Sequence, residues 1–341
     1  MHALSGSIVP GFRSAQSGLR ANSIITGASY YGRSGVPLPA ISEKTMTAKM
    51  VNAWMLVIED DPAGTDYNNP NSCYQRLIKD NIYQCVDLLY LGFAETVPTS
   101  AKTVPAGDGS SYTIQISSGD DHRSGLTNQD YMNYIMRDAK KSNPKIKIAV
   151  MLGYVNQKWL SQIFPDPAKP DAASADKFAA NLTSYLKHYG LDGFDIDWEY
   201  PIASYTTQDQ IRLLIDAIGA QFKRQTDKHY YLTLSPDSKG NLDADAVNRN
   251  VDFLNLQLYS GHTYLDDFKG INPGLFAYGA KFEANGSSTE WGEGHQTAQQ
   301  AYDENEAKYK YSIFTQWRLN SQNFGFELAN QQKLYALVFP K

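Results

Sequence analysis

The chain has 341 residues, of which 42% are hydrophobic and 20% are charged, and its formal net charge is −5. This composition is that of an ordinary globular protein with enough length for a large core. The acidic balance and the absence of a basic run argue against nucleic acid as a partner, because a phosphate backbone requires clustered positive charge. No apolar run is long enough for a membrane span, so we also expect no membrane partner.

The first part of the chain, residues 1–47, is punctuated by glycine, proline and serine and carries no sustained periodic pattern. It is predicted to be an irregular N-terminal extension. Residues 48–341 are predicted to form one domain. Cys73 and Cys85 are the only cysteines, and no metal-ligand spacing accompanies them, which argues against a zinc site. The sequence leaves open whether they form a disulfide.

Short apolar stretches typical of strands recur from residue 51 onward and alternate with helix-like stretches. The eight strand candidates are residues 53–58, 86–93, 146–152, 194–198, 230–234, 253–258, 275–282 and 312–317. The helix candidates, in which apolar residues recur with a period of about 3.6, are residues 129–141, 178–188, 210–222 and 328–338.

This alternation of strands and helices predicts a parallel sheet, and eight such units in the available length fit an α/β protein with a (β/α)8 TIM barrel. A doubly wound open sheet is the alternative. It is disfavoured because no glycine-rich phosphate loop follows an early strand.

The most informative stretch is residues 191–201, where acids alternate with apolar residues. In a strand, Asp195, Asp197 and Glu199 share one face. Burying several like charges together is unfavourable unless protons or hydrogen bonds compensate, so such a strand indicates a functional site. Glu199 ends the fourth predicted strand, at the end of a barrel where catalytic groups lie.

Residues 192–199, with the sequence DGFDIDWE, resemble the DxxDxDxE signature of glycoside hydrolase family 18, the chitinase family. Four acids at fixed spacing inside an apolar strand make this signature highly specific, and a looser similarity extends from about residue 50 to the end. The resemblance implies a catalytic (β/α)8 barrel over residues 48–341. It also implies that chitin or an N-acetylglucosamine oligosaccharide is the substrate, with no metal or organic cofactor.

The resemblance further implies substrate-assisted hydrolysis with retention, in which the substrate's 2-acetamido oxygen attacks the anomeric carbon. Glu199 would be the general acid and then the base, with a pKa raised by burial and by the neighbouring acids. Asp197 would hydrogen-bond the acetamido N–H. Asp195 would share a proton with Asp197, since two close buried carboxylates do not both ionise readily. Tyr259 would hydrogen-bond the acetamido carbonyl.

Several other positions are candidate substrate contacts by the same resemblance. Trp317 resembles the tryptophan of the eighth strand that floors the cleavage subsite, and Gln257 lies in the stretch that resembles the sixth strand. Asp192, at the start of the acidic strand, is expected chiefly to support that strand. The remaining candidates are Phe93, at the end of the second strand, and the aromatic residues Tyr154 and Tyr200, with Trp54, Trp159, Tyr264 and Trp291 as further positions for outer subsites.

The sequence departs from the family pattern at three places. The family usually ends its third strand in Ser-x-Gly-Gly, but residues 151–154 read Met-Leu-Gly-Tyr, so the serine that commonly supports the buried Asp pair is missing. Ser260 follows Tyr259, where many chitinases carry Asp or Asn, which predicts altered substrate contacts. Residues 283–311 are too few for a large α+β insertion, which predicts an open cleft and cleavage within the polymer.

Three functions fit these observations. A chitinase is favoured because Trp198 stands between the last Asp and Glu of the motif. An endo-β-N-acetylglucosaminidase that cleaves the chitobiose core of N-glycans shares the fold and mechanism. A non-catalytic chitin-binding lectin is disfavoured, because such proteins usually lose the acid and Glu199 is present. We expect a secreted or extracellular protein, although residues 1–10 lack the basic and apolar regions of a secretory signal.

Overall fold

The fold is given by a computed structural model, which describes residues 48–57, 66–101, 111–117, 122, 125–153, 162–200, 202–282 and 296–341. The predicted N-terminal extension, residues 1–47, lies outside the described residues. So do the candidate substrate contacts Tyr154, Trp159 and Trp291.

Eight parallel strands form a closed barrel, which confirms the predicted fold. Neighbouring strands pair in chain order, and the pairing of Ala53 in the first strand with Leu89 in the second closes the ring. All eight predicted strands are present. They are β1 (Met50–Leu56), β2 (Leu88–Pro98), β4 (Lys147–Leu152), β5 (Gly193–Trp198), β6 (Tyr231–Pro236), β7 (Phe253–Leu256), β8 (Phe276–Lys281) and β9 (Ile313–Trp317).

A further strand, β3 (Tyr112–Ile116), pairs antiparallel with the last residues of β2 and was not predicted. The second strand is longer than predicted, because it continues past residue 93 to Pro98 to make this pairing. The two strands form an antiparallel extension of the barrel sheet.

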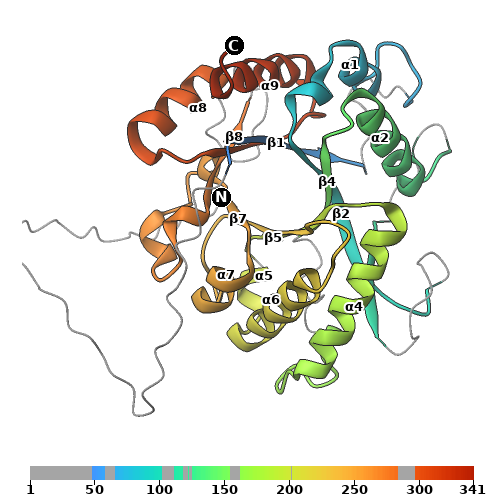
Figure 1. The fold of residues 1–341 in the computed structure, drawn as a ribbon, viewed down its shortest axis with the longest axis vertical. Helices are drawn as coiled ribbons and strands as arrows, with labels where there is room; N and C mark the ends of the chain where they lie inside the picture. The colour runs from blue at the N-terminus through green and yellow to red at the C-terminus, as the bar shows by residue number, and fades with distance from the viewer. Residues whose placement is uncertain are drawn as a thin grey trace, which may run out of the picture. The chain divides into compact units, whose positions relative to one another are not determined.

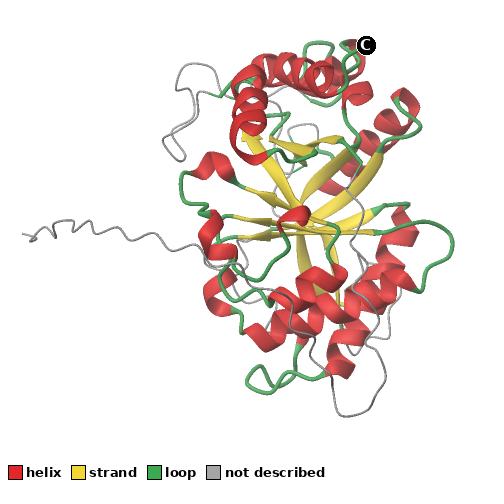
Figure 2. Cartoon of the chain, turned by 60° about the vertical axis from the view of Figure 1, so that its left-hand side comes forward, coloured by secondary structure: helices red, strands yellow, loops and turns green. Residues whose placement is uncertain are grey.

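Helices surround the barrel (Figure 1), and Figure 2 shows the strands running between them. The four predicted helices are present, whereas the seven-residue helices α1, α7 and α8 were missed because two turns carry too little periodicity. No helix within the described ranges is long and apolar enough to cross a membrane. The helices are α1 (Cys73–Lys79), α2 (Asn128–Ser142), α4 (Ala172–Tyr189), α5 (Ile202–Tyr205), α6 (Gln208–Lys223), α7 (Ala244–Asn250), α8 (Ala298–Glu304) and α9 (Phe324–Val338), with short turns η1 (Ile82–Cys85), η2 (Leu258–Ser260), η3 (Leu265–Phe268), η4 (Pro273–Leu275) and η5 (Asn305–Tyr309).

The strands separate two apolar layers because successive side chains point to opposite faces. On β5, Phe194 and Ile196 belong to the large core cluster that also contains the buried helix residues. The opposite face fills the barrel interior, where Trp54, Tyr90 and Met151 belong to a separate cluster. Aspartates on the interior face of β5 are therefore held in the barrel, and none of them faces the helix layer.

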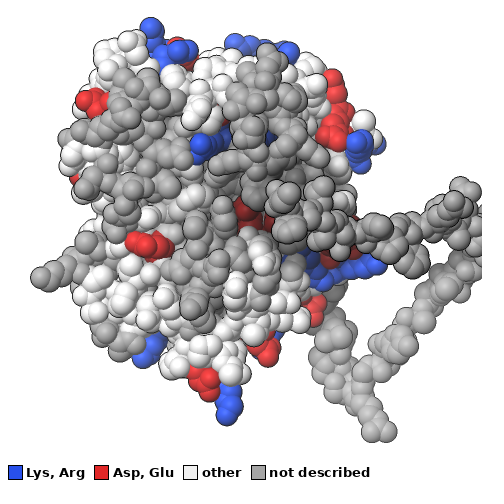
Figure 3. All heavy atoms as spheres, turned by 180° about the vertical axis from the view of Figure 1, so that it is seen from behind, with Lys and Arg blue, Asp and Glu red and all other residues white. Residues whose placement is uncertain are grey.

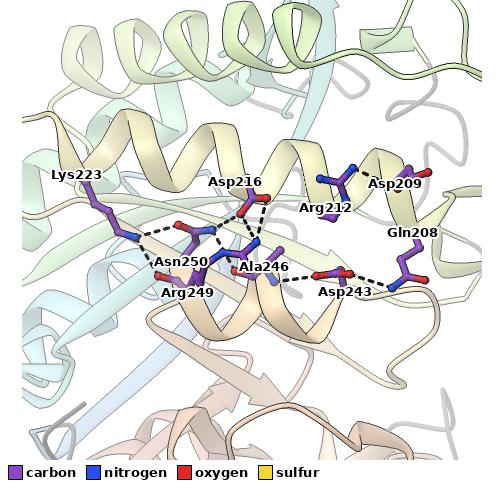
Figure 4. Close-up of polar contacts among 9 residues, drawn as sticks. All are labelled: Gln208, Asp209, Arg212, Asp216, Lys223, Asp243, Ala246, Arg249 and Asn250. Carbon is purple, nitrogen blue, oxygen red and sulfur yellow. Dashed lines mark hydrogen bonds and ion pairs between the residues drawn. The ribbon is translucent and has the colours of Figure 1, made fainter. Parts of the chain in front are cut away.

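Figure 4 shows the polar contacts between α6 and α7, two helices whose close approach depends on a glycine. Asp216 of α6 accepts hydrogen bonds from Arg249 (3.0 Å) and Asn250 (2.7 Å), the last two residues of α7. Lys223 of α6 donates to the side-chain oxygen of Asn250 (3.0 Å). A Cβ atom on Gly219 would lie 2.5 Å from Asn250 side-chain atoms. The absence of a side chain at Gly219 thus allows the two helices to approach closely enough for this network.

Cys73 and Cys85 do not form a disulfide with each other in the structure. Cys73 is buried in α1, and its thiol donates to the carbonyl oxygen of Leu319 (3.3 Å). Burial raises the pKa of the Cys85 thiol, and the neighbouring Asp87 adds to this effect.

Charged side chains lie in small groups on the face drawn in Figure 3. Arg76 and Asp80 form an ion pair across four residues, and so do Glu304 and Lys308. Such pairs contribute only about 0.3–0.5 kcal/mol each when they are exposed. We therefore attribute the stability of the domain chiefly to its two apolar layers.

Candidate active site

The acids of β5 are supported by hydroxyl groups on the next strand, β6. Asp195 is 0% exposed, and it lies in register with Thr233, as Asp197 does with Ser235. Thr233 donates a hydrogen bond of 2.5 Å to one carboxylate oxygen of Asp195, and Ser235 donates one of 2.8 Å to the other. Burial raises the pKa of Asp195 to about 7, and these two hydrogen bonds limit the rise.

The strand β4 lacks the serine that commonly supports the buried Asp pair in the family, and the hydroxyl groups of β6 support Asp195 instead. The residue on β4 that lies in register with Asp195 is Met151, which is buried in the barrel interior. The support for Asp195 therefore comes from β6 instead of β4. Behind it, the amide of Asn255 donates to the hydroxyls of Tyr90 (3.2 Å) and Ser235 (3.3 Å), so the hydroxyl of Ser235 is itself held in place.

Asp197 and Glu199 are joined through the amide of Gln257. Its nitrogen donates to Glu199 (2.6 Å), to Asp197 (3.2 Å) and to the backbone carbonyl of Ser235 (3.0 Å). The hydroxyl of Tyr259 donates to the side-chain oxygen of Gln257 (3.0 Å). Since the amide oxygen accepts from Tyr259, the amide nitrogen is directed at the two carboxyl groups.

Burial also dominates the electrostatics of this pair. It raises the pKa of Asp197 well above its usual range, and the negative charge of Glu199 raises it further. Burial raises the pKa of Glu199 as well, although hydrogen bonds from Gln257 and Asp197 oppose the rise. The influence of Glu199 on Asp197 exceeds that of Asp195. The expected sharing of a proton between Asp195 and Asp197 stays a prediction.

A cavity of about 480 Å³ lies at the carboxyl ends of strands β5 to β9. It brings together Glu199, Asp197, Tyr259, Gln257 and Trp317 from the predicted set. Tyr200 stands at its edge with 71% of its surface exposed. The described residues that line the cavity are Asp197, Glu199, Tyr200, Asp237, Gln257, Tyr259, Ser260, His262, Lys281 and Trp317. In the described part of the chain, no group of three or more His, Cys, Asp or Glu residues could hold a metal ion.

Trp317 ends β9 and is held by aromatic neighbours from the first two strands. Its ring meets Trp54 edge-on, with centroids 5.7 Å apart, and the ring of Phe93 lies 6.3 Å away. The guanidinium of Arg318 lies 5.9 Å from the Trp317 ring. Trp54 belongs to the apolar cluster of the barrel interior, and Phe93 and Trp317 pack against it. The substrate contacts expected of Phe93 and Trp54 stay predictions.

The predicted substrate contact of Asp192 is wrong. Asp192 precedes β5, at the opposite end of the strand from Glu199, and it is buried. It forms ion pairs with Lys140 (3.0 Å) and Lys228 (2.9 Å) and accepts from the backbone N–H of Ile148 (2.9 Å). Burial raises the pKa of Asp192, but these bonds outweigh it and hold the pKa below the usual range. Asp192 thus joins the amino end of β5 to Lys140, Lys228 and β4, which agrees with its expected role in supporting the strand.

Asp237 and Lys281 line the cavity but were not singled out in the sequence, and His262 lines it as well. Asp237 directly follows β6, and Lys281 is the last residue of β8 with 9% of its surface exposed. The available signal was their position, because each is a polar residue at the carboxyl end of a predicted barrel strand.

Comparison with known proteins gives one family. Residues 65–311 match the family model described as Glycosyl hydrolases family 18. Chitinase 1 from Aphanocladium album is 28% identical over 148 residues, which cover 40% of this chain and 34% of that relative. The aligned segments span about a third of the length of the curated relatives.

Solved structures share the fold at lower sequence identity. The class V chitinase from Nicotiana tobaccum has a TM-score of 0.58 at 14% identity, and the match covers 84% of this chain and 99% of that one. Human YKL-39, described as a pseudo-chitinase with retained chitooligosaccharide binding, has a TM-score of 0.57 at 12% identity, covering 85% and 98%. The barrel fold therefore occurs both in chitinases and in a relative described as a pseudo-chitinase.

Proposed function

The chain belongs to glycosyl hydrolases family 18, and we propose that it is a chitinase that cleaves β-1,4-linked N-acetylglucosamine polymers with retention of configuration. The observation that carries the proposal is the Gln257 amide, which joins Asp197 and Glu199 at the cavity beside Tyr259. Acid catalysis of glycoside cleavage requires a carboxyl group that can hold a proton at the cavity, and a second carboxyl group beside it favours the protonated form.

In the proposed reaction Glu199 is the general acid. Burial raises the pKa of Glu199, which favours its acid form, and it donates this proton to the leaving glycosidic oxygen. The substrate's 2-acetamido oxygen attacks the anomeric carbon as the bond breaks. Glu199, now ionised, accepts a proton from the incoming water, which opens the cyclic intermediate and returns Glu199 to its acid form.

Asp197 and Tyr259 orient the acetamido group in this scheme. When Glu199 has lost its proton, Asp197 turns its carboxylate toward the acetamido N–H and offsets the positive charge of the intermediate. The Tyr259 hydroxyl, which donates to Gln257 in the structure, donates to the acetamido carbonyl in the bound complex. Trp317 supplies a flat apolar face for the sugar ring, and Tyr200 offers a second aromatic face at the exposed edge.

Two other functions remain as alternatives. Cleavage of the chitobiose core of N-glycans uses the same chemistry, and Trp198 favours the chitinase over it. The fold of YKL-39 motivates a chitin-binding lectin, but the presence of Glu199 with a hydrogen-bonding partner favours catalysis. The proposal includes cleavage within the polymer and a secreted or extracellular location, where a polymeric substrate is accessible.

Product analysis separates these functions. The wild type and Glu199→Gln are incubated with N-acetylglucosamine hexamer and, separately, with an N-glycoprotein. Shorter oligomers formed only by the wild type support the chitinase, and products from the middle of the hexamer support internal cleavage. Release of glycan without hexamer cleavage would establish the N-glycan enzyme. Tight hexamer binding by both proteins without turnover would establish the lectin.

A further inference from the structure

Asp237 lines the same cavity as the two acids of the proposed reaction, and it directly follows β6, the strand that pairs with β5. Its backbone N–H donates to the carbonyl of Trp198 (3.2 Å), the residue directly before Glu199. Its side chain lines the same cavity as Asp197 and Glu199. Asp237 is therefore fixed to β5 at the level of the catalytic acid.

One oxygen of the Asp237 carboxyl group has no described hydrogen-bond partner. Its Oδ1 atom is buried, and no hydrogen-bond partner for this atom occurs among the described residues. A buried charge without such a partner is weakly screened and acts on its neighbours over several ångströms. In agreement, the negative charge of Asp237 raises the pKa of both Asp197 and Glu199, in addition to the larger effect of burial.

Other titratable groups face the same space. Asp195 lies on β5 beneath the pair and also raises the pKa of Asp197. Lys281, a basic residue, reaches the cavity from the end of β8. The loop after β7 contributes Tyr259 and His262, and Tyr200 follows Glu199. Of the described lining residues, only Asp237 adds a negative charge to the Asp197–Glu199 pair.

We propose that Asp237 is a positioning residue whose negative charge keeps a proton on the Asp197–Glu199 pair and thereby holds Glu199 in its acid form. Donation of that proton to a substrate rests on the proposed function. The effect of Asp237 on the protonation of the Asp197–Glu199 pair does not. No bond to the substrate is required, because Asp237 acts through its field on Glu199.

The direct test is a titration of the Glu199 carboxyl carbon by NMR in protein labelled with 13C at glutamate side chains. The signal is assigned by its loss in Glu199→Gln. We expect the apparent pKa of Glu199 to fall by at least about 0.5 in Asp237→Asn, because removing a neighbouring negative charge makes ionisation easier. Asp237→Glu keeps the charge and should leave the value near that of the wild type. An unchanged value in Asp237→Asn overturns the proposal.

Two controls sharpen the titration. Asp176→Asn removes an exposed charge on α4 and should leave the pKa of Glu199 unchanged. Asp237→Ser provides a second neutral variant if Asp237→Asn does not fold, and it should give the same fall. Thermal unfolding of each variant establishes that the titrated protein is folded.

The pH profile of hexamer cleavage gives an independent readout. A lower pKa of the general acid moves the basic limb of kcat/KM to lower pH in Asp237→Asn, whereas Asp237→Glu retains the wild-type limb. Loss of activity by the same factor at every pH, with an unchanged titration, would identify a substrate contact and overturn the proposal. If the wild type cleaves no oligomer, the proposed function fails, and the NMR titration still decides the role of Asp237.

Discussion

Replacing Asp195 by asparagine should stabilise the fold at alkaline pH. The pKa of Asp195 is raised by burial to about 7, from an ordinary value of 3.8. A carboxyl group whose pKa is raised on folding binds protons more tightly in the folded state. Its contribution to stability is therefore fully present below pH 3.8 and is lost as the pH rises through about 7.

The size of this effect follows from the pKa. At about 1.4 kcal/mol for each tenfold change in proton binding, the rise from 3.8 to about 7 corresponds to about 4 kcal/mol. Asparagine is nearly isosteric and has no charge to bury, but it offers one acceptor oxygen where the carboxylate offers two. One of the two hydroxyls, Thr233 or Ser235, must therefore turn from donor to acceptor, which costs about 1 kcal/mol.

We expect Asp195→Asn to be more stable than the wild type by about 3 kcal/mol at pH 8, and less stable by about 1 kcal/mol in acid. Urea unfolding at several pH values between 4 and 8 measures the difference directly. Asp176→Asn, which removes an exposed charge, should show no such trend. A stability difference for Asp195→Asn that does not vary with pH would refute the assigned burial cost of this carboxyl group.

Three further variants test other parts of the structure. Thr233→Val removes the 2.5 Å donor to Asp195 and should lower kcat for hexamer cleavage about tenfold, with KM nearly unchanged; an unaltered kcat would contradict the assigned support from β6. Gly219→Ala places a Cβ atom 2.5 Å from the side chain of Asn250 on α7 and should reduce the free energy of unfolding by about 1–3 kcal/mol. Gly325→Ala, with open space around it, should be neutral or slightly stabilising. Equal effects of the two variants in urea unfolding would argue against the close helix contact. Trp317→Ala should weaken hexamer binding to Glu199→Gln protein by about 1–3 kcal/mol in calorimetry, because an aromatic face is lost; undiminished affinity would place the sugar elsewhere.

The fold was predictable because its signals are local. Each barrel strand is a short apolar run. The helix α6 is predicted both by its apolar period and by its N-terminal cap, in which the side chains of Thr207 and Gln210 accept hydrogen bonds from each other's backbone N–H groups. The helices α1, α7 and α8 are too short for such a period to emerge. The strand β3 depends on its pairing with the far end of β2, which the sequence does not encode locally.

Part of the candidate site was predictable because the strand period fixes the direction of the side chains. The alternation that places Asp195, Asp197 and Glu199 on one face also separates Asp192 from them, because Asp192 stands an odd number of residues from each. The family motif groups all four acids and does not indicate this difference. The partners on β6 follow from the register in which β5 and β6 pair. That register places Thr233 beside Asp195 and is a property of the folded barrel.

The most direct test of the central claim is the anomeric form of the first product. Proton NMR during hydrolysis of N-acetylglucosamine hexamer distinguishes the two anomers before they equilibrate. Hydrolysis in which Glu199 is the acid and the substrate's acetamido group is the nucleophile predicts that the β-anomer forms first with the wild type, and that Glu199→Gln forms no product. Initial release of the α-anomer, or equal hydrolysis by Glu199→Gln, would contradict this mechanism.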